Sequence, residues 1–576
     1  MLKLLKYFKN YKKQCIIAPL FKFLEACFEI VIPIIMKVII DKGINFGGTA
    51  DKTLIIKLTM VMLAMGILGF ATALIAQYFS AVAGMGIGTE LRKACYKHLG
   101  KLTNADVDKM GSSTVINRLT NDVNHVSTGV NRFLRLFLRS PFIILGTVVM
   151  SFVLDVTMGL IVLASIPLIL LIVYLIGRFT VPRYTAVQRD TDSVALATKE
   201  NLEGVRVIRA FSKQASERER FNETTDKLHK KQVNVSFVAA LLNPLTYAIA
   251  NIAIVCILYF GGGRVNSGSM TDGEITTLVN YIFQILNAVI ALSGLVTILA
   301  KAKVSANRVS AFLSTTPSFT DEGNTIVEPI IGADKIAFEG VTFSYNQNKT
   351  VLEDITFQVK GGQTIGVIGG TGSGKSTLVN LIPRLYEVDS GCVYVDGVDV
   401  KKYPFTQLRS KIAIAVQHAT LFKGTIRDNL LFANPTATEE QMISALKLAQ
   451  AYNFVFEKKG LDTPVARGGA NFSGGQKQRL NVARALVSNP EILILDDSSS
   501  ALDYATDLAL RTSLKTLKDL TVIIISQRVA SVMQADKIII LEDGCIEGIG
   551  THEELYQTNA VYQEIYNSQT KENGNE

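Results

Sequence analysis

The sequence predicts a helical membrane domain of six spans, followed by a largely parallel α/β domain. Long uncharged runs fill the chain up to about residue 305, and beyond about residue 331 short β-rich segments alternate with helical ones. Of the 576 residues, 48% are hydrophobic. A chain of this length and apolar content can hold more than one domain and is too apolar for an ordinary soluble enzyme.

Four of the six spans follow directly from the length of apolar runs. Each run exceeds the roughly 20 residues that a helix needs to cross a bilayer. The four runs cover residues 58–89, 156–177, 232–263 and 275–300. A fifth run, at residues 140–154, is short, and we expect it to extend back through Arg139.

The first predicted span, residues 15–40, differs from the others because it carries charged residues: Lys22, Glu25, Glu29 and Lys37. Glu25 and Glu29 lie one helical turn apart and form the one acidic pair within a predicted span. Ionisable residues inside a membrane are candidates for function, but they also commonly pair with a neighbouring helix or reach the interface. Both interpretations of this pair remain open from the sequence.

Basic residues indicate the orientation of the spans. Two long polar segments, about 90–135 and 178–231, are rich in lysine and arginine, whereas the loops on the opposite side hold few. The positive-inside rule therefore places both segments and both termini in the cytoplasm, in a multi-pass protein of the cell membrane. We expect the two segments to extend the membrane helices inward as rods. Residues 1–14 are expected to form a basic amphipathic helix on the inner membrane surface.

The composition argues against several classes of function. The net charge of +9 is explained by basic cytoplasmic loops, so a nucleic-acid partner is not expected. The six cysteines lie far apart without a C-x-x-C pair, and the five histidines form no metal-binding pattern. The sequence therefore suggests neither a zinc site nor a disulfide framework.

Residues 331–576 are predicted to form one α/β domain. The runs TIGVIG, KIAIAV, EILIL and TVIIIS are apolar and rich in β-branched residues, and helical stretches separate them. This alternation is typical of a parallel sheet covered by helices. The polar segment 316–330, which contains Pro317 and Pro329, is expected to be a linker, and residues 1–315 are assigned to the membrane domain.

A phosphate-binding motif lies near the start of this domain. Residues 369–376 fit G-x-x-x-x-G-K-[ST] between an apolar strand and a predicted helix. Such glycines let backbone N–H groups close around phosphate oxygens, while Lys375 is expected to reach the β- and γ-phosphates and Ser376 to hold Mg²⁺. The candidate ATP-binding residues here are Gly369, Gly370, Thr371, Gly372, Ser373, Gly374, Lys375, Ser376 and Thr377.

The stretch NFSGGQKQR, residues 471–479, carries the most specific resemblance. With the P-loop before it, and with Asp496 after it at the end of the strand EILIL, the chain resembles ABC transporters of the exporter half-transporter type over nearly its whole length. Serine and two glycines before a helix make an anion-binding N-terminus. The resemblance implies that four residues cap an ATP held by a second nucleotide-binding domain: Ser473, Gly474, Gly475 and Gln476.

The resemblance implies further roles. Tyr345 would stack on adenine, Gln417 lies in the Q-loop, and residues 500–503 form the D-loop. ATP and Mg²⁺ are the implied cofactors, with Ser376, Gln417 and Asp496 as candidate magnesium ligands. Residues 111–126 and 201–214 resemble the two intracellular loops whose short coupling helices dock on nucleotide-binding domains. The expected fold class is therefore a six-span helical membrane domain followed by a P-loop NTPase domain of the ABC ATPase type.

Two positions near the γ-phosphate depart from the family pattern. Asp497 replaces the glutamate that polarises the attacking water, and Gln527 replaces a histidine. Aspartate retracts the carboxylate by about one bond length, and a misplacement of about 1 Å can cost on the order of 10²-fold in rate. Glutamine cannot carry the charge of imidazole. Both residues are catalytic candidates, and together with the altered loop 465–469 they predict a degenerate site that hydrolyses ATP slowly.

The sequence thus predicts ATP-driven export of a small hydrophobic or amphipathic substrate by a dimer. A heterodimer with a competent second half-transporter is favoured, as in multidrug-type exporters, because a homodimer would have two slow sites. The signature of this chain would then serve the competent site of the partner. The alternatives are a homodimeric lipid flippase or drug exporter, and a regulatory ATP-binding subunit.

Overall fold

The computed structural model describes residues 2–44, 50–321, 326–345 and 349–572. The chain divides into two compact units: residues 1–100 with 112–315 form unit 1, and residues 101–111 with 316–576 form unit 2. Unit 1 is helical, and every strand of the described residues belongs to unit 2. Part of the predicted linker, residues 322–325, lies outside the described residues.

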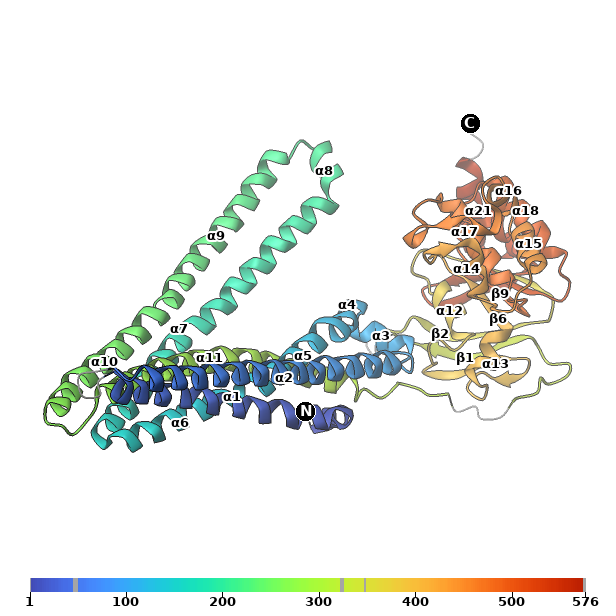
Figure 1. Cartoon of the computed structure of the whole chain (residues 1–576). Helices are drawn as coiled ribbons and strands as arrows, with labels where there is room; N and C mark the ends of the chain where they lie inside the picture. Colours follow the sequence, from blue (N-terminus) through green and yellow to red (C-terminus); the bar gives the residue numbers. More distant parts are fainter. Residues whose placement is uncertain (1, 45–49, 322–325, 346–348, 573–576) are drawn as a thin grey trace. The chain divides into compact units, whose positions relative to one another are not determined.

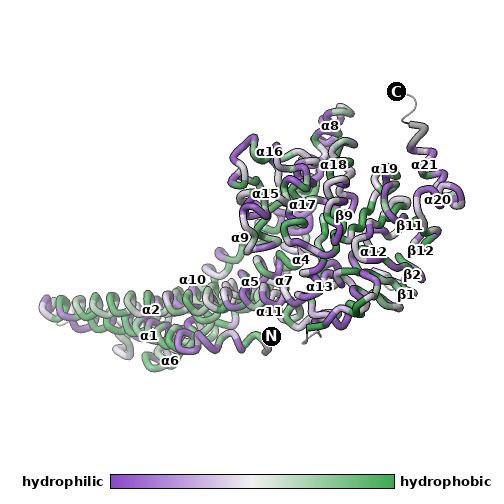
Figure 2. Tube along the Cα trace, turned by 90° about the vertical axis from the view of Figure 1, so that its right-hand side faces the viewer, coloured by the Kyte–Doolittle hydropathy of each residue, from purple (hydrophilic) through white to green (hydrophobic). Residues whose placement is uncertain are grey.

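Unit 1 contains five helical stretches that are long and apolar enough to cross a membrane, within the described residues. Each contains one predicted span, and the stretch Ser112–Leu154 shows that the short run at 140–154 extends back through Arg139, as expected. Figure 2 shows hydrophobic residues along much of α2 and α6. The helices are α2 (Lys52–Leu99), α4 (Ser112–Asn117), α5 (Val123–Arg132), α6 (Arg139–Leu154), α7 (Val156–Glu203), α9 (Gln214–Ala240), α10 (Leu242–Asn266) and α11 (Asp272–Phe312).

The predicted first span is helix α1 (Lys12–Val38), which has 27 residues. Its length suffices for a span, but its charged residues keep it outside the five apolar stretches. The segment before it, where we expected a basic amphipathic helix over residues 1–14, is a 3₁₀ helix at η1 (Leu2–Tyr11). Five helical stretches of the described residues are therefore long and apolar enough to be spans. Whether α1 is a sixth span depends on whether its charged side chains are paired inside the membrane domain.

The polar segments between spans are helical rods, as the sequence predicts. Helix α2 continues to Leu99, well past the end of its apolar run, and α7 continues to Glu203. Helices α7 and α9 form a long hairpin with the six-residue helix α8 (Val205–Ala210) at its tip (Figure 1). This short helix lies within the segment 201–214, which resembles an intracellular loop.

Polar side chains of α11 attach this helix to the backbone of α1. Pro33 has no backbone N–H, so the carbonyl of Glu29 has no helical donor four residues later. The Nε2 of Gln284 donates to that carbonyl at 3.0 Å, and the hydroxyl of Tyr281 donates to the carbonyl of Ile30 at 3.0 Å. Such bonds between helices are a common source of cohesion in membrane proteins, where lipid offers no hydrogen bonds.

Unit 2 is built on two main sheets. The six-stranded sheet has the order β12-β11-β3-β10-β9-β6, and all its neighbouring pairs are parallel except β11 with β12, as predicted for a largely parallel sheet. The second sheet is antiparallel, in the order β2-β1-β4-β5, and β7 pairs with β8. The strands are β1 (Ile336–Phe343), β2 (Leu352–Val359), β3 (Thr364–Ile368), β4 (Ser390–Val395), β5 (Val398–Asp399), β6 (Ile412–Ala415), β7 (Gly424–Thr425), β8 (Pro464–Val465), β9 (Ile492–Asp496), β10 (Thr521–Ile525), β11 (Lys537–Glu542) and β12 (Cys545–Gly550).

The central strands are buried on both faces, which explains their continuous apolar sequences. All five residues of β9 and of β10 are buried, as expected for parallel strands covered by helices. The helices of unit 2 are α3 (Asn104–Met110), α12 (Lys375–Leu381), α13 (Phe405–Lys411), α14 (Ile426–Leu431), α15 (Glu439–Leu448), α16 (Tyr452–Phe456), α17 (Gly474–Leu486), α18 (Tyr504–Lys515), α19 (Val529–Val532), α20 (His552–Thr558) and α21 (Ala560–Glu572).

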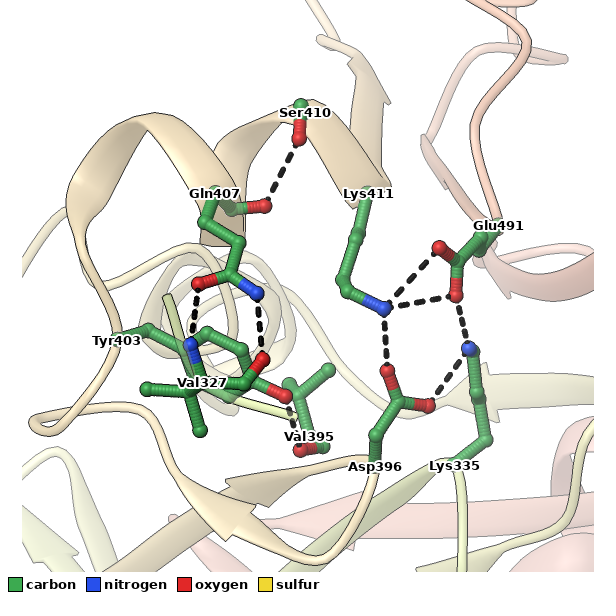
Figure 3. Close-up of polar contacts among 9 residues, drawn as sticks. All are labelled: Val327, Lys335, Val395, Asp396, Tyr403, Gln407, Ser410, Lys411 and Glu491. Atoms are coloured by element: carbon green, nitrogen blue, oxygen red, sulfur yellow. Dashed lines mark hydrogen bonds and ion pairs between the residues drawn. The ribbon is translucent and has the colours of Figure 1, made fainter. Parts of the chain in front are cut away.

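Four charged residues connect the two main sheets (Figure 3). Asp396, after β4, accepts from Lys335 at 2.6 Å and from Lys411 at 2.7 Å. Glu491, before β9, pairs with the same two lysines. Burial acts to raise the pKa of Asp396, but the hydrogen bonds from the two lysines outweigh it and lower that pKa below its ordinary value. The ionised carboxylate therefore stabilises the folded unit.

We expect Asp396→Asn to lower the free energy of unfolding of unit 2 by about 3 kcal/mol, because it leaves two partly buried lysines with only the more exposed Glu491 as a carboxylate partner. Since the pKa of Asp396 is lowered by folding, its stabilisation is present above the unfolded pKa, about 3.9, and is lost as the pH falls through the folded value. Thermal unfolding followed by circular dichroism at pH 7 measures the effect. Glu491→Gln is the matched control and should cost less, since Glu491 is 47% exposed. Equal effects of the two variants would contradict this account.

Candidate nucleotide site

The predicted nucleotide-binding residues meet at the carboxyl ends of neighbouring strands. The P-loop follows β3, Gln527 follows β10, Asp496 ends β9, and Gln417 follows β6. Parallel strands bring such segments to one edge, where open α/β sheets bind ligands. A cavity of about 210 Å³ lies there, lined by Val351, Thr371, Gly372, Gly374, Lys375, Ser376, Thr377, Gln417, Asp496, Asp497, Ile525 and Gln527.

Glycine is required at two positions of the P-loop. Gly374, the residue before α12, has a φ of +98°, which side chains of L-residues rarely adopt. At Gly369 a Cβ atom would lie 2.0 Å from the carbonyl oxygen of Leu541 in β11. The loop can therefore approach the sheet and turn directly into the helix, so that the N–H groups at the start of α12 line the cavity.

Lys375 lies in the loop as the sequence predicts. Its Nζ donates to the carbonyl oxygens of Gly369 at 2.9 Å and Gly370 at 2.5 Å, and its side chain is largely buried. Burial lowers the pKa of Lys375, while the nearby carboxylates of Asp497 and Asp496 act to raise it. A buried ammonium at this position can provide positive charge for phosphate oxygens.

Ser376 and Asp496 form a pair of oxygen ligands on facing segments. The hydroxyl of Ser376 donates to Oδ1 of Asp496 at 2.8 Å. Burial raises the pKa of Asp496, and the bond from Ser376 acts to lower it. Magnesium prefers oxygen ligands and usually binds through one or two carboxylates together with substrate phosphates and waters. This donor set therefore fits Mg²⁺, and among the described residues no group of three His, Cys, Asp or Glu side chains forms a dedicated metal cage.

Asp497 and Gln417 are in direct contact. The Nε2 of Gln417 donates to Oδ2 of Asp497 at 3.0 Å. Asp497 has a φ of +46°, a left-handed conformation that aspartate tolerates better than most residues with a Cβ. The carboxylate is thus held against the Q-loop glutamine at the edge of the cavity.

Gln527 lines the cavity and is exposed. Its backbone is held by a residue that the sequence did not single out. Gln569 of α21 donates from Nε2 to the carbonyl of Gln527 at 2.7 Å and accepts from the N–H of Val529 at 2.8 Å. A lone glutamine in a C-terminal helix offers no sequence pattern for such a clamp.

Tyr345 contacts the P-loop helix but does not line the cavity itself. Its hydroxyl lies 3.0 Å from that of Thr377, and its ring packs edge-on against Tyr386 at 5.1 Å. The hydroxyl of Tyr386 in turn donates at 2.6 Å to Asp108 in α3. The sequence did not single out α3, although the capping box formed by Thr103 and Asp106 is a recognisable helix start.

The signature residues lie away from this cavity, and none of them lines it. Ser473 caps the N-terminus of α17, accepting from the N–H of Gln476, while Gln476 accepts from the N–H of Ser473. The altered loop forms strand β8 and the 3₁₀ helix η6 (Arg467–Gly469), and Arg467 is exposed. The N-terminus of α17 therefore does not line the cavity in which the P-loop of the same chain would hold a phosphate.

Side chains of α17 donate hydrogen bonds to the Q-loop backbone, a connection that no sequence motif indicates. Gln478 donates to the carbonyl of Gln417, Asn481 donates to that of Val416 at 3.0 Å, and Arg484 donates to that of Thr420 at 2.9 Å. The three residues recur every third position on one face of the helix. The helix that carries the signature and the loop that carries Gln417 are therefore joined.

Comparisons with known proteins agree with this geometry. A family model described as "ABC transporter transmembrane region" matches residues 15–289, and one described as "ABC transporter" matches residues 352–500. The chain is 34% identical to the uncharacterized ABC transporter ATP-binding protein YfiB of Bacillus subtilis, over 100% of both chains. It is 32% identical to the putative multidrug export ATP-binding/permease protein YgaD of the same organism, over 99% of each.

More distant matches include an ATP-dependent lipid A-core flippase of Vibrio parahaemolyticus, which is 28% identical over 98% of this chain and 97% of the flippase. Among solved structures, a bacterial Atm1-family ABC exporter with ATP bound superposes with a TM-score of 0.79, covering 97% of this chain and 98% of that one. At 21% sequence identity this likeness concerns the fold.

Proposed function

We propose that this chain, which belongs to the ABC transporter family, is one half of an ATP-driven exporter in the cell membrane. The observation that carries this proposal is the convergence of Lys375, Ser376, Asp496 and Gln417 on one cavity. The chain carries its membrane region and its ATPase domain in one polypeptide.

Each residue of the cavity has a role that its position supports. Lys375 neutralises the β- and γ-phosphates of ATP, and the N–H groups of the loop 369–377 surround them. Ser376, Asp496 and Gln417 would hold Mg²⁺, which would supply charge neutralisation for phosphoryl transfer. Tyr345, which lies outside the cavity with its hydroxyl 3.0 Å from that of Thr377, would stack on the adenine. Asp497 orients the attacking water from a retracted position, and Gln527 contacts the γ-phosphate.

The proposed exporter is a dimer, because two surfaces of this chain lack a partner within it. The signature residues 473–476 line no part of the cavity of their own chain. At the tip of the α7–α9 hairpin, Leu202, Val207 and Phe211 are 72%, 60% and 72% exposed. Exposed apolar clusters of this kind mark protein contacts. We propose that the signature caps the ATP of the second subunit and that α8 docks on its nucleotide-binding domain.

A heterodimer is the favoured assembly. Asp497 and Gln527 make the site of this chain slow, and a partner with glutamate and histidine at these positions would provide a competent site completed by Ser473–Gln476 of this chain. The second candidate is a homodimeric lipid flippase, which the 28% identity to the lipid A-core flippase favours. A regulatory ATP-binding subunit is the third.

The proposed membrane domain comprises residues 1–315 with six spans, and within it residues 101–111 belong to the compact unit 2. A linker at 316–330 and the nucleotide-binding domain at 331–576 follow. Helix α1 serves as the sixth span because its charges are paired within unit 1: Glu25 with Lys22 at 2.5 Å and Glu29 with Arg139 at 2.5 Å. Both termini and the nucleotide-binding domain face the cytoplasm. The substrate is a small hydrophobic or amphipathic molecule.

Lys375→Ala tests the ATP site. We expect the variant to lower nucleotide photolabelling of this subunit by about 10-fold or more, since each charge-assisted hydrogen bond to phosphate contributes about 1.5–3 kcal/mol. Lys459→Ala, at an exposed position, is the matched control and should leave labelling unchanged. Undiminished labelling in Lys375→Ala would remove the cavity as the ATP site.

A further inference from the structure

A glutamine of the C-terminal helix holds the loop that carries Gln527. Helix α21 lies beside α19 and α20 within unit 2 (Figure 2). The side-chain amide of Gln569 in α21 makes two hydrogen bonds: its Nε2 donates to the carbonyl of Gln527 at 2.7 Å, and its Oε1 accepts from the N–H of Val529 at 2.8 Å. We call these two bonds the Gln569 clamp. One planar amide uses both its donor and its acceptor on the same short segment, which restricts that segment more than a single bond can.

The clamp also bonds a backbone group that the local sequence leaves without a partner. Val529 is the first residue of α19, and the first N–H groups of a helix have no acceptor within the helix. In the described part of the chain, the residue before α19, Arg528, makes no side-chain capping bond. The acceptor comes instead from a residue 40 positions further along the chain.

Helix α21 is anchored independently of this loop. Tyr562 is fully buried, and its hydroxyl lies 2.8 Å from Nδ1 of His552 in α20. Ile565 packs against the same hydrophobic core as Tyr562. Because Tyr562, Ile565 and Gln569 follow one another at intervals of three and four residues, they lie on one face of α21. The face that attaches the helix to unit 2 therefore also presents Gln569 to the loop.

The backbone around Gln527 is fixed on both sides. Before it, the N–H of Ser526 donates to the carbonyl of Val367 in β3 at 3.1 Å, which joins this end of the loop to the sheet. After it, the clamp holds the carbonyl of Gln527 and the N–H of Val529. The side chain of Gln527 lines the nucleotide cavity. Its direction therefore depends on the sheet and on α21 together.

Such a restriction affects ATP and ADP differently. The proposed partner of Gln527 is the γ-phosphate, which ADP lacks. A loop with several conformations makes this contact only in the fraction of molecules in which it is correctly arranged, and the apparent affinity falls with that fraction. Fixing the loop therefore raises the affinity for ATP and leaves the affinity for ADP unchanged.

We propose that Gln569 is a positioning residue of the ATP site: it orients Gln527 for the γ-phosphate and thereby sets the preference of the site for ATP over ADP. This role rests on the proposed ATP site and assigns part of its nucleotide selectivity to α21. No described residue of α21 lines the cavity, so the helix acts through the loop.

The test compares binding of a non-hydrolysable ATP analogue, adenylyl imidodiphosphate, with binding of ADP, each with Mg²⁺, to the purified full-length chain in lipid nanodiscs. Displacement of a fluorescent ADP derivative measures both affinities. We expect Gln569→Met, which keeps a long side chain but no amide, to lower the preference for the analogue over ADP by about fivefold, the usual net value of one neutral hydrogen bond. The affinity for ADP should not change.

Two further variants test the chemistry of the clamp. Gln569→Glu keeps an acceptor for the N–H of Val529 but has no donor for the carbonyl of Gln527 when ionised, so it should lower the preference at least as much as Gln569→Met. Gln563→Met is the matched control. Gln563 lies in the same helix, but its Nε2 donates to the carbonyl of Tyr556 in α20 at 2.6 Å, so its loss should leave the preference unchanged. Thermal unfolding checks that each variant is folded.

A double-mutant cycle with Gln527→Ala shows whether Gln569 acts through Gln527. Gln527→Ala alone should lower the preference for the analogue, and Gln569→Met should then have no further effect. Equal losses of affinity for both nucleotides in Gln569→Met would indicate a purely structural role and overturn the proposal, as would an unchanged preference or additive effects in the double variant. Failure of the ATP site itself would appear differently, as undiminished nucleotide binding in Lys375→Ala.

Discussion

Gly474→Asp is expected to lower steady-state ATP hydrolysis of the assembled transporter by about 10²–10³-fold, the usual loss when one positioned donor to a transition-state charge is removed. Gly474 is the first residue of α17, where N–H groups and the helix dipole favour an anion. In the proposed dimer, an aspartate there would oppose the γ-phosphate of the ATP held by the partner subunit. The nearest atom to a Cβ at this position is the Cβ of Ala501 at 3.6 Å, so the side chain fits without disturbing the fold.

Asp497→Asn is the matched comparison, because it removes a carboxylate of the cavity in this chain. We expect it to reduce turnover of the complex by less than about threefold, since a general base contributes only when it is positioned. Steady-state phosphate release, with thermal unfolding as the control for folding, measures both variants. If Asp497→Asn abolished turnover while Gly474→Asp was mild, the proposed division between a slow and a competent site would be wrong. Equal and complete loss in both would indicate a homodimer with an active Asp497.

The second large effect is a gain. Asp497→Glu combined with Gln527→His is expected to raise hydrolysis at the site of this chain by about 10–10³-fold, which approaches the usual contribution of a positioned base. Each single change should recover little, because residues acting on one transition state are not additive. The measurement is single-turnover hydrolysis in a complex whose partner site is blocked by substitution of the partner's P-loop lysine.

The structure shows what the double variant must accommodate. Asp497 has a φ of +46° and accepts from Gln417 at 3.0 Å. A glutamate in this left-handed conformation costs about 1 kcal/mol. That strain is present before and during hydrolysis, so it lowers the stability of the fold and not the rate.

Gln527 offers a position where histidine can act. Its side chain is exposed at the cavity. Gln569 fixes the backbone after it, donating to the carbonyl of Gln527 at 2.7 Å and accepting from the N–H of Val529 at 2.8 Å. A histidine should therefore enter without moving the loop. Gln569→Ala in the double variant is expected to reverse part of the gain. No gain in the double variant itself would place the slowness elsewhere, with the loop 465–469 and the partner's signature as the next candidates.

Much of the site could be predicted from the sequence because its parts are local. A P-loop, a strand ending in aspartate and a serine-glycine helix start are each short segments whose chemistry depends on neighbouring residues. The structure places Lys375, Ser376, Gln417, Asp496, Asp497 and Gln527 around one cavity. Hydrophobic runs likewise predicted the five apolar helical stretches, four by length alone and one by extending a short run through Arg139. The charged α1 could not be classified this way, because its suitability as a span depends on ion pairs with another helix.

What the sequence determined by itself is the order of the segments, the class of fold and the chemical types at the ATP site, since these follow from residues close together in the chain. The tertiary structure alone decided which distant side chains act on them. The clamp of Gln569 on the loop of Gln527, the hold of α17 on the Q-loop, and the pairing of Glu29 with Arg139 join residues that are 42, 65 and 110 positions apart, respectively. A sequence pattern does not predict such contacts, because they depend on how helices pack against loops and against one another. The same is true of the bond from Gln284 to the Glu29 carbonyl, which Pro33 leaves without a helical donor.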